Sequence, residues 1–300
     1  QALGGTGALK IGADFIKQLV PGAKVAISNP SWENHRALFE RAGFEVVNYP
    51  YYDASTHGLD FQGMLNALRA LPAQSVVVLH ACCHNPTGVD LTTDQWREVA
   101  QVVKQTQLIP FLDIAYQGFG DGLEQDAAAV RLFAALDMTM FISSSFSKSF
   151  SLYGERVGAL TIVTGSQDES NRVLSQVKRV IRTNYSNPPT HGGTIVSTVL
   201  NTPELFALWD QELAGMRDRI RLMRSQLVEK LAQHGVKKDF GFVMKQRGMF
   251  SFSGLSAAQV EVLRADHAIY AVSSGRICVA ALNSHNIDVV AKAIASAMKN

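Results

Sequence analysis

The feature that most constrains the fold is an alternation of short apolar runs, rich in valine and isoleucine, with longer stretches of helical period. Runs with the length and composition of buried strands occur at 24–28, 45–49, 75–81, 109–115, 138–143 and 159–163. Helical patterns lie between them, for example at 6–19, 61–70 and 93–105. This alternation predicts repeated βα units, and therefore an α/β domain wound around a mostly parallel sheet.

A long uninterrupted helical pattern at 203–233 follows the alternating region, and it is long enough to join two domains. The remainder predicts short strands near 242–245, 249–253 and 277–281 and a last helix at 286–298, typical of a small α+β domain. We place the boundary within the long helix, with a large domain at 1–215 and a small C-terminal domain at 216–300.

Composition excludes several classes of protein. The 300 residues are 47% hydrophobic and 18% charged, which suits a globular chain with a substantial core. A net charge of +2 without a long basic run argues against a nucleic-acid or polybasic membrane surface. No apolar stretch approaches the roughly 20 residues of a membrane span, no secretory leader opens the chain, and its three cysteines suit no disulfide framework. We expect a soluble cytoplasmic protein with reduced thiols.

A lysine closes a hydroxyl-rich segment at the end of one predicted strand. Lys148 follows Ser-Ser-Ser-Phe-Ser, which includes Ser145, and Arg156 comes eight positions later. An amine can hold a carbonyl cofactor as a Schiff base, while hydroxyls, backbone N–H groups and a guanidinium together bind phosphate. A lone lysine is more often a solvated surface residue, and a serine cluster is as often an ordinary polar turn. Their combination predicts a site for pyridoxal phosphate.

The chain opens with a second candidate anion site. Gly4, Gly5, Thr6 and Gly7 form a glycine-rich turn before a helical pattern, where backbone N–H groups and the helix dipole attract anions. The dinucleotide fingerprint Gly-x-Gly-x-x-Gly fails at Lys10, and no strand is predicted before the turn. By itself, the segment predicts no more than the start of a helix.

Four more side chains are candidates for contact with a flat, charged ring. Asp113 ends the apolar run Ile-Pro-Phe-Leu-Asp, so it is either exposed or, if buried, paired with a cation such as a protonated pyridine nitrogen. Tyr116 and Asn85 could hydrogen-bond the ring's phenolic oxygen, and Trp32 could stack on its face. Asn85 also suits a simple Asn-Pro turn, and Trp32 a loop aromatic folded onto the core.

The segment His80-Ala-Cys82-Cys83-His84 has metal-binding residue types at close spacing. Adjacent cysteines on an extended segment point to opposite faces, and no second ligand cluster is visible. We therefore predict no metal site.

Taken together, these segments resemble the class I aminotransferases of the pyridoxal phosphate fold type I family, in their aspartate and aromatic amino-acid branch. The resemblance covers the whole chain. It rests on Gly-Gly-Thr-Gly at Gly4, Asn-Pro-Ser-Trp at Asn29, Cys-Cys-His-Asn-Pro-Thr-Gly at Cys82, Asp-Ile-Ala-Tyr-Gln-Gly-Phe at Asp113, Ser-Phe-Ser-Lys at Ser145, Arg-x-Asn-Tyr-Ser-Asn-Pro-Pro at Arg182 and Ser-Gly-Arg at Ser274. It implies a homodimer with shared active sites.

The resemblance also implies a role for each matching residue. Lys148 resembles the Schiff-base lysine that also moves the substrate proton, Asp113 the partner of the ring nitrogen, with His35 behind it, and Tyr116 a partner of the phenolic oxygen. The other cofactor-binding positions are Gly5, Thr6, Trp32, Asn85, Ser145 and Arg156. Substrate would be bound by Trp32 and Asn85, by Arg276 at the α-carboxylate, and by Arg182, reaching from the partner subunit to a distal carboxylate.

Family members carry a further N-terminal segment with an arm on the partner, part of the small domain, a tyrosine for the neighbouring phosphate and a flap over the substrate. We therefore expect an upstream segment to be missing from this chain.

The favoured function is transfer of an amino group between an aromatic amino acid, with aspartate and glutamate also accepted, and 2-oxoglutarate. The alternatives are an aspartate-specific aminotransferase, a decarboxylase or lyase of the same fold type, which would not need Arg182, and a noncatalytic fragment.

Overall fold

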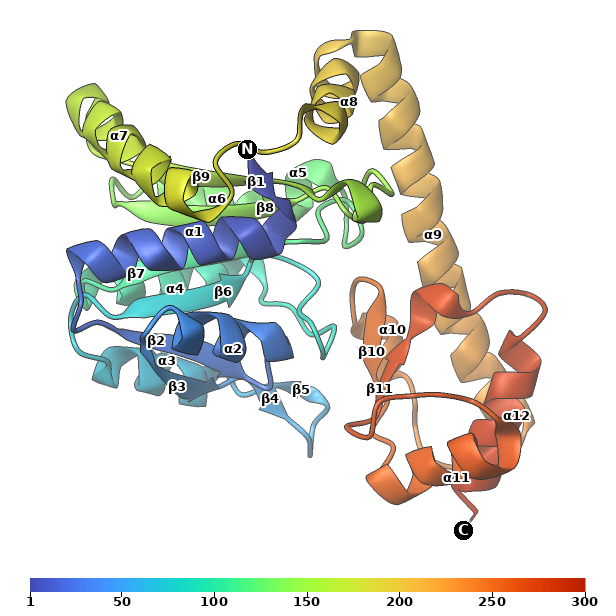
Figure 1. Ribbon diagram of the computed structural model, residues 1–300. Coiled ribbons are helices and arrows are strands. Elements are labelled where there is room, and N and C mark those ends of the chain that lie inside the picture. The colour runs from blue at the N-terminus through green and yellow to red at the C-terminus, as the bar shows by residue number, and fades with distance from the viewer. Residues whose placement is uncertain (300) are drawn as a thin grey trace.

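A seven-stranded sheet forms the centre of the computed structural model, which describes residues 1–299 (Figure 1). Its strand order is β1-β9-β8-β7-β6-β2-β3. Strands β8, β7, β6, β2 and β3 run parallel, whereas β9 is antiparallel to both β8 and β1. The strands are β1 Ala2–Leu3, β2 Lys24–Asn29, β3 Glu45–Pro50, β6 Val76–His80, β7 Ile109–Ile114, β8 Met140–Ser145 and β9 Val157–Val163. The predicted α/β fold with a mostly parallel sheet is confirmed.

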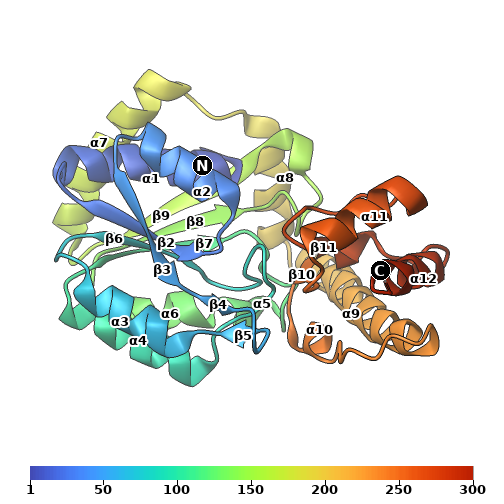
Figure 2. The ribbon, with the colours of Figure 1, turned by 90° about the horizontal axis from the view of Figure 1, so that it is seen from below.

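Helices cover both faces of this sheet (Figure 2). One face carries α1 (Gly4–Leu19), α2 (Glu33–Arg41) and α7 (Gln167–Asn184). The other carries α3 (Phe61–Ala70), α4 (Thr93–Gln105) and α6 (Ala128–Ala134), which follows the short α5 (Leu123–Asp126). A hairpin of β4 (Tyr52–Asp53) and β5 (Gly58–Leu59) lies beyond β3.

Alternate residues of each central strand face different layers. On β6, Val76 and Val78 pack in the core beneath α1 and α2, while Val77 and Leu79 pack in the core on the opposite face. Because both faces are covered, the strands are apolar throughout, which is why they were visible in the sequence as continuous runs.

A single long helix leads to the C-terminal unit (Figure 1). The elements after β9 and α7 are α8 Thr190–Asn201, α9 Pro203–Gln233, α10 Phe242–Lys245, β10 Phe250–Phe252, α11 Ala257–His267, β11 Arg276–Cys278 and α12 Ile287–Ala297. Short 3₁₀ helices lie at Tyr153–Glu155 and Val279–Ala281. Strands β10 and β11 pair antiparallel, and α12 packs on α9. The predicted boundary at 215/216 falls inside α9 and stays a proposal.

Two predicted strands of the C-terminal unit were wrong. Residues Phe242–Lys245 form helix α10, and the run predicted at 277–281 is a strand only as far as Cys278, after which a 3₁₀ helix begins. In apolar runs as short as these, the periodicity of the residues does not distinguish a strand from a helix. A two-stranded sheet of three-residue strands also offers no further partner. A short strand, β1, does precede the glycine-rich turn, although none was predicted.

No helix within residues 1–299 combines the length and the apolar character that crossing a bilayer requires. All three cysteines are free, Cys82 and Cys83 being buried and Cys278 exposed.

Candidate functional site

A cavity of about 350 Å³ lies where the carboxyl ends of the parallel strands meet the C-terminal unit. Many predicted site residues line it, although they are far apart in the sequence: Gly5, Thr6, Trp32, Asn85, Asp113, Tyr116, Ser145, Lys148, Arg156 and Arg276. Strands β6, β7 and β8 end side by side, and this brings the segments that follow them to one place. Asp113, Lys148 and Arg156 therefore face a shared space, as the predicted cofactor requires.

One end of the cavity offers hydrogen-bond donors to an anion. Helix α1 begins at Gly4 without a side-chain N-cap, so the N–H groups of its first turn lack intrahelical partners. The Arg156 guanidinium lies across this turn and donates to Ser147 Oγ at 3.3 Å. A Cβ atom on Gly4, whose φ is +68°, would be 2.5 Å from Arg156 Nη2. A larger residue would be strained at this φ and would displace the guanidinium, so glycine at position 4 lets Arg156 lie beside the helix N-terminus, where both could bind one anion.

A buried carboxylate lies in another wall of the cavity. Asp113 is 5% exposed, and His35 Nε2 lies 2.8 Å from its Oδ2. Burial by itself raises the pKa of Asp113, but the hydrogen bond and charge of His35 outweigh it, so the pKa lies below its ordinary value. Ser31 Oγ lies 3.0 Å from the other ring nitrogen of His35 and orients the ring. Asp113 is thus ionised at neutral pH and suited to pair with a cationic ring nitrogen.

Lys148 is half-buried, and its amine lies 4.8 Å from the centroid of the Tyr116 ring. Burial lowers the pKa of Lys148; Asp113 opposes this shift and Arg156 reinforces it. A lowered pKa increases the fraction of neutral amine, which is the nucleophilic form.

Asn85 connects the sheet side of the cavity to the C-terminal side. Its Nδ2 lies 3.4 Å from the Tyr116 hydroxyl, and its Oδ1 accepts a hydrogen bond from Arg276 Nη1 at 3.1 Å. The Arg276 guanidinium carbon lies 4.8 Å from the centroid of the Phe250 ring. Burial raises the pKa of Tyr116, which keeps its hydroxyl protonated and able to donate.

His80 is a site residue that sequence reasoning considered only as a metal ligand. It lines the cavity, and its two ring nitrogens have no hydrogen-bond partner among the described residues. Its ring centroid lies 4.8 Å from that of His35 and 4.4 Å from that of His84. Burial, followed by the charge of His35, lowers the pKa of His80 to about 3, so the ring is neutral.

Other lining residues were also missed, namely Leu9, Ala115, Tyr153, Met249 and Phe250. Apolar and aromatic residues carry no chemical signature in a sequence, and the two from the C-terminal unit reach the cavity only through tertiary packing.

The adjacent cysteines do not lie on an extended segment, so the reason given for excluding a metal there was wrong. Cys83 has a φ of +51°, and one ligand atom each of Cys82, Cys83 and Asp126 lie within 4.8 Å of one another. The Asp126 carboxylate already accepts hydrogen bonds from the backbone N–H groups of Gly118, Gly120 and Asp121. This carboxylate therefore has a structural function in the loop after Tyr116.

Arg182 does not line the cavity. It is exposed on α7, where its guanidinium donates to Ser186 Oγ. Its predicted contact with the distal carboxylate of a substrate is not formed within one chain.

The donor set suits pyridoxal phosphate. A phosphate fits the uncapped helix and Arg156, a protonated ring nitrogen fits the ionised Asp113, and a carbonyl carbon fits the amine of Lys148. Trp32, which packs edge-on against His35 at 5.3 Å between ring centroids, supplies an aromatic surface at the same cavity.

Comparison with known proteins gives a consistent result. Residues 1–294 match the family model described as aminotransferase class I and II. An aspartate aminotransferase of Pseudomonas aeruginosa is 70% identical over 98% of this chain and 74% of the relative. An aromatic-amino-acid aminotransferase of Escherichia coli is 52% identical over 99% of this chain and 75% of the relative. The chain thus spans about three quarters of the length of these relatives.

Solved structures show the same similarity. An aromatic-amino-acid aminotransferase from Burkholderia pseudomallei, covalently bound to pyridoxal phosphate, superposes with a TM-score of 0.98 at 69% identity, covering 99% of this chain and 74% of that one. An aromatic amino acid aminotransferase from Psychrobacter sp. B6, cocrystallised with aspartic acid, gives a TM-score of 0.98 at 47% identity, covering 100% and 75%.

Proposed function

This chain belongs to the class I and II aminotransferases, and we propose on that premise that it transfers an amino group between an aromatic amino acid, aspartate or glutamate and 2-oxoglutarate, using pyridoxal phosphate. The observation that carries the proposal is the shared cavity of Lys148, Asp113 and Arg156. A nucleophilic amine, a buried ionised acid and an anion-binding helix end are together what this cofactor needs.

Each side chain has a separate task in holding the cofactor. Gly5 and Thr6 in the first turn of α1, with Ser145 and Arg156, would bind the phosphate, and Lys148 would form the covalent link. Asp113, oriented by His35, would hold the proton on the ring nitrogen. Asn85 and Tyr116 would bind the phenolic oxygen, and Trp32 would pack on the ring face.

The bound cofactor supplies an electron sink for the charge that develops at the α-carbon of the amino acid. The chain supplies binding and proton transfer. Arg276 binds the α-carboxylate, for which its planar fork is suited. The neutral Nζ of Lys148 would accept the proton that leaves the α-carbon and would hold it at the cavity for transfer to the cofactor. The lowered pKa of Lys148 increases the fraction of neutral amine that can accept this proton.

The names of the relatives support both groups of substrates. The relative at 70% identity is named an aspartate aminotransferase, while the structure at 69% identity is named an aromatic-amino-acid aminotransferase. An aspartate-specific enzyme is the alternative that the first name favours. The ratio of kcat/KM for tyrosine to that for aspartate decides between them, since a negligible value for tyrosine contradicts the broader range.

We further propose that the enzyme is a homodimer in which Arg182 of one subunit serves the cavity of the other. Arg182 lies outside the cavity of its own chain, and Tyr153 at the cavity is 67% exposed. Apolar side chains near the junction of α8 and α9 are also exposed, including Leu205, Phe206 and Leu208. Light scattering should give twice the mass of one chain.

The central test is an absorbance spectrum of the chain with pyridoxal phosphate, followed by addition of tyrosine or glutamate. We expect a visible band that disappears with either amino acid as a 2-oxo acid is released. Lys148→Ala should lack the covalent band and lose transamination, whereas Lys178→Ala, a change on α7 away from the cavity, should keep both. A band that persists in Lys148→Ala would contradict the role of Lys148, and release of carbon dioxide would support a decarboxylase instead.

A further inference from the structure

Helix α9 contains an arginine that is buried without an acidic partner. Arg224 is 2% exposed, and no carboxylate of residues 1–299 lies within ion-pair distance of its guanidinium. It instead donates to three backbone carbonyls: that of Val243 at 3.0 Å, that of Gly248 at 2.8 Å and that of Phe250 at 2.7 Å. Burial lowers its pKa to about 10, and the side chain stays charged at neutral pH.

Burying a charge in this way carries a large desolvation cost, which the surrounding hydrogen bonds must offset. The three carbonyls all belong to one short segment, 243–250, which we call the α10–β10 loop. A guanidinium presents its donors in a fixed plane, so a single side chain can fix the relative positions of all three carbonyls. Arg224 is therefore the internal anchor of this loop.

The anchored loop is fitted closely against the segment that carries Asn85. The backbone N–H of Arg247 donates to the carbonyl of Gly88 at 2.7 Å. A Cβ atom on Gly248, whose φ is +81°, would lie 2.5 Å from the Cβ of Cys83. Glycine is required there, and the loop has little freedom to shift towards the sheet.

The end of the loop forms part of the cavity wall. Met249 and Phe250 both line the cavity. The Phe250 ring meets the Tyr116 ring edge-on, with 6.1 Å between centroids, and its face lies 4.8 Å from the guanidinium carbon of Arg276. A displacement of Phe250 would therefore move the group that binds the substrate carboxylate.

We propose that Arg224 is a positioning residue for substrate binding, which acts by fixing the α10–β10 loop so that Phe250 holds Arg276 at the cavity. The inference rests on the proposed role of Arg276 in binding the α-carboxylate. Arg224 itself touches neither cofactor nor substrate, since it does not line the cavity.

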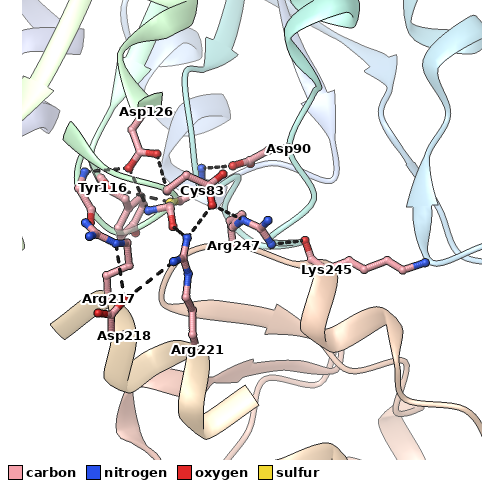
Figure 3. Close-up of polar contacts among 12 residues, drawn as sticks. Cys83, Asp90, Tyr116, Asp126, Arg217, Asp218, Arg221, Lys245 and Arg247 are labelled. Atoms are coloured by element: carbon pink, nitrogen blue, oxygen red, sulfur yellow. Dashed lines mark hydrogen bonds and ion pairs between the residues drawn. The ribbon is translucent and has the colours of Figure 1, made fainter. Parts of the chain in front are cut away.

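The outer side of the same loop is held differently (Figure 3). Arg247 and Arg221 approach each other there, and both bind the carboxylate of exposed Asp121. Exposed ion pairs of this kind contribute little to stability. The buried Arg224 contacts are therefore the ones expected to fix the loop.

Helix α9 offers a matched control. Arg219 also donates to two backbone carbonyls of the C-terminal unit, those of Ala280 and Leu282, each at 2.7 Å. Residues 280–282 do not line the cavity, and Arg219 is exposed. Loss of Arg219 should affect the packing of the unit but leave the three bonds from Arg224 to the α10–β10 loop in place.

The test compares Arg224→Met, Arg224→Lys and Arg219→Met with the unchanged chain. The probe is 3-phenylpropionate, which carries a carboxylate and an aromatic ring but no amine, with binding followed by calorimetry. In Arg224→Met we expect about tenfold weaker probe binding and about tenfold higher KM for tyrosine, equivalent to one lost charge-assisted hydrogen bond. The kcat and the cofactor band should change by no more than about twofold, and Arg219→Met should leave KM and probe binding within about twofold.

Arg224→Lys keeps the charge but loses the planar set of guanidinium donors, and it should raise KM for tyrosine by an intermediate amount. If Arg224→Met does not fold, Arg224→Lys is the variant that tests the proposal. A variant that melts earlier but binds the probe and tyrosine as the unchanged chain does would overturn the proposal, because Arg224 would then be only structural. If the unchanged chain forms no cofactor band, the proposed function fails, while probe binding, which depends on Arg276, still decides the positioning role.

Discussion

The two walls of the cavity, one on the sheet and one on the C-terminal unit, are held in place by different interactions. The sheet wall carries Asp113 and Lys148 at the ends of parallel strands, where β7 bonds to a neighbour on each side and packs against a core on each face. The C-terminal wall carries Phe250 and Arg276 on two paired strands of three residues each. Short two-stranded sheets are marginal by themselves, so this wall depends on side-chain bonds from α9.

The difference indicates that the sheet wall binds the cofactor and the C-terminal wall binds the substrate. Asp113, which would hold the charge of a bound cofactor, lies on a strand with a hydrogen-bonded neighbour on each side. Phe250 and Arg276, which would meet a substrate that enters and leaves, lie on a sheet of only two strands. We therefore expect changes on the sheet wall to affect kcat and changes on the C-terminal wall to affect KM.

After the loss of activity expected for Lys148→Ala, the largest effect is expected on the sheet wall, from Asp113→Asn. The change keeps the shape and a hydrogen bond to His35 but removes the charge that pairs with the ring nitrogen. Loss of one preorganised electrostatic group typically lowers kcat by about 10²- to 10³-fold, and we expect a decrease in this range. Steady-state kinetics at saturating tyrosine and 2-oxoglutarate measure it.

The same variant has a pH signature with a definite sign. Asp113 raises the pKa of Lys148, so removing the carboxylate should lower that pKa further. The amine becomes neutral as pH rises through its pKa, and the midpoint for attachment of pyridoxal phosphate should move to lower pH in Asp113→Asn. An unchanged kcat, or a midpoint that moves to higher pH, would show that Asp113 does not supply the dominant charge of this wall.

A smaller effect is expected on the C-terminal wall, from Arg276→Lys. Lysine keeps the charge but loses the planar fork, the bond to Asn85 Oδ1 and the contact with the Phe250 face. We expect kcat/KM to fall by about 10- to 100-fold, mainly through KM, which corresponds to one hydrogen bond to a charged group.

The decrease should be similar for tyrosine and aspartate, because both have the α-carboxylate. The cofactor band should be unchanged. A fall confined to kcat would remove the distinction between the two walls.

The sheet wall was largely predictable from the sequence, and the C-terminal wall was not. Strand ends follow a local rule: an apolar run ends and polar residues follow, as at Asp113 and Ser145, and parallel strands bring those ends together. The bounds predicted for α3, α4 and α9 were confirmed, because each has a clear helical period. Arg276 was identified by family resemblance, whereas Phe250, Arg224 and the helix at Phe242–Lys245 depend on contacts between distant segments. No local pattern specifies such contacts.

The smallest effect is expected at the exposed link between the two walls, from Asp121→Asn. The Asp121 carboxylate lies 2.6 Å from Arg221 on α9 and 3.0 Å from Arg247 on the α10–β10 loop. Asp121 and Arg221 are exposed and Arg247 is partly exposed, and ion pairs in such surroundings contribute about 0–1 kcal/mol. We expect the free energy of unfolding, from urea denaturation, to fall by less than about 1 kcal/mol, and the difference to shrink in 1 M salt because the screening length falls to about 3 Å.

Asp218→Asn is the matched control, since Asp218 lies 3.8 Å from the same Arg221 but forms no ion pair with the loop. Arg224 already anchors the loop, so the exposed ion pairs of Asp121 should contribute little to its position. The KM of Asp121→Asn should therefore stay within about twofold of that of Asp218→Asn. A KM increase in Asp121→Asn as large as that expected for Arg224→Met would mean that the surface ion pairs hold the C-terminal wall. The C-terminal wall would then not be fixed by the buried Arg224 side chain, and the proposed difference between the two walls would be wrong.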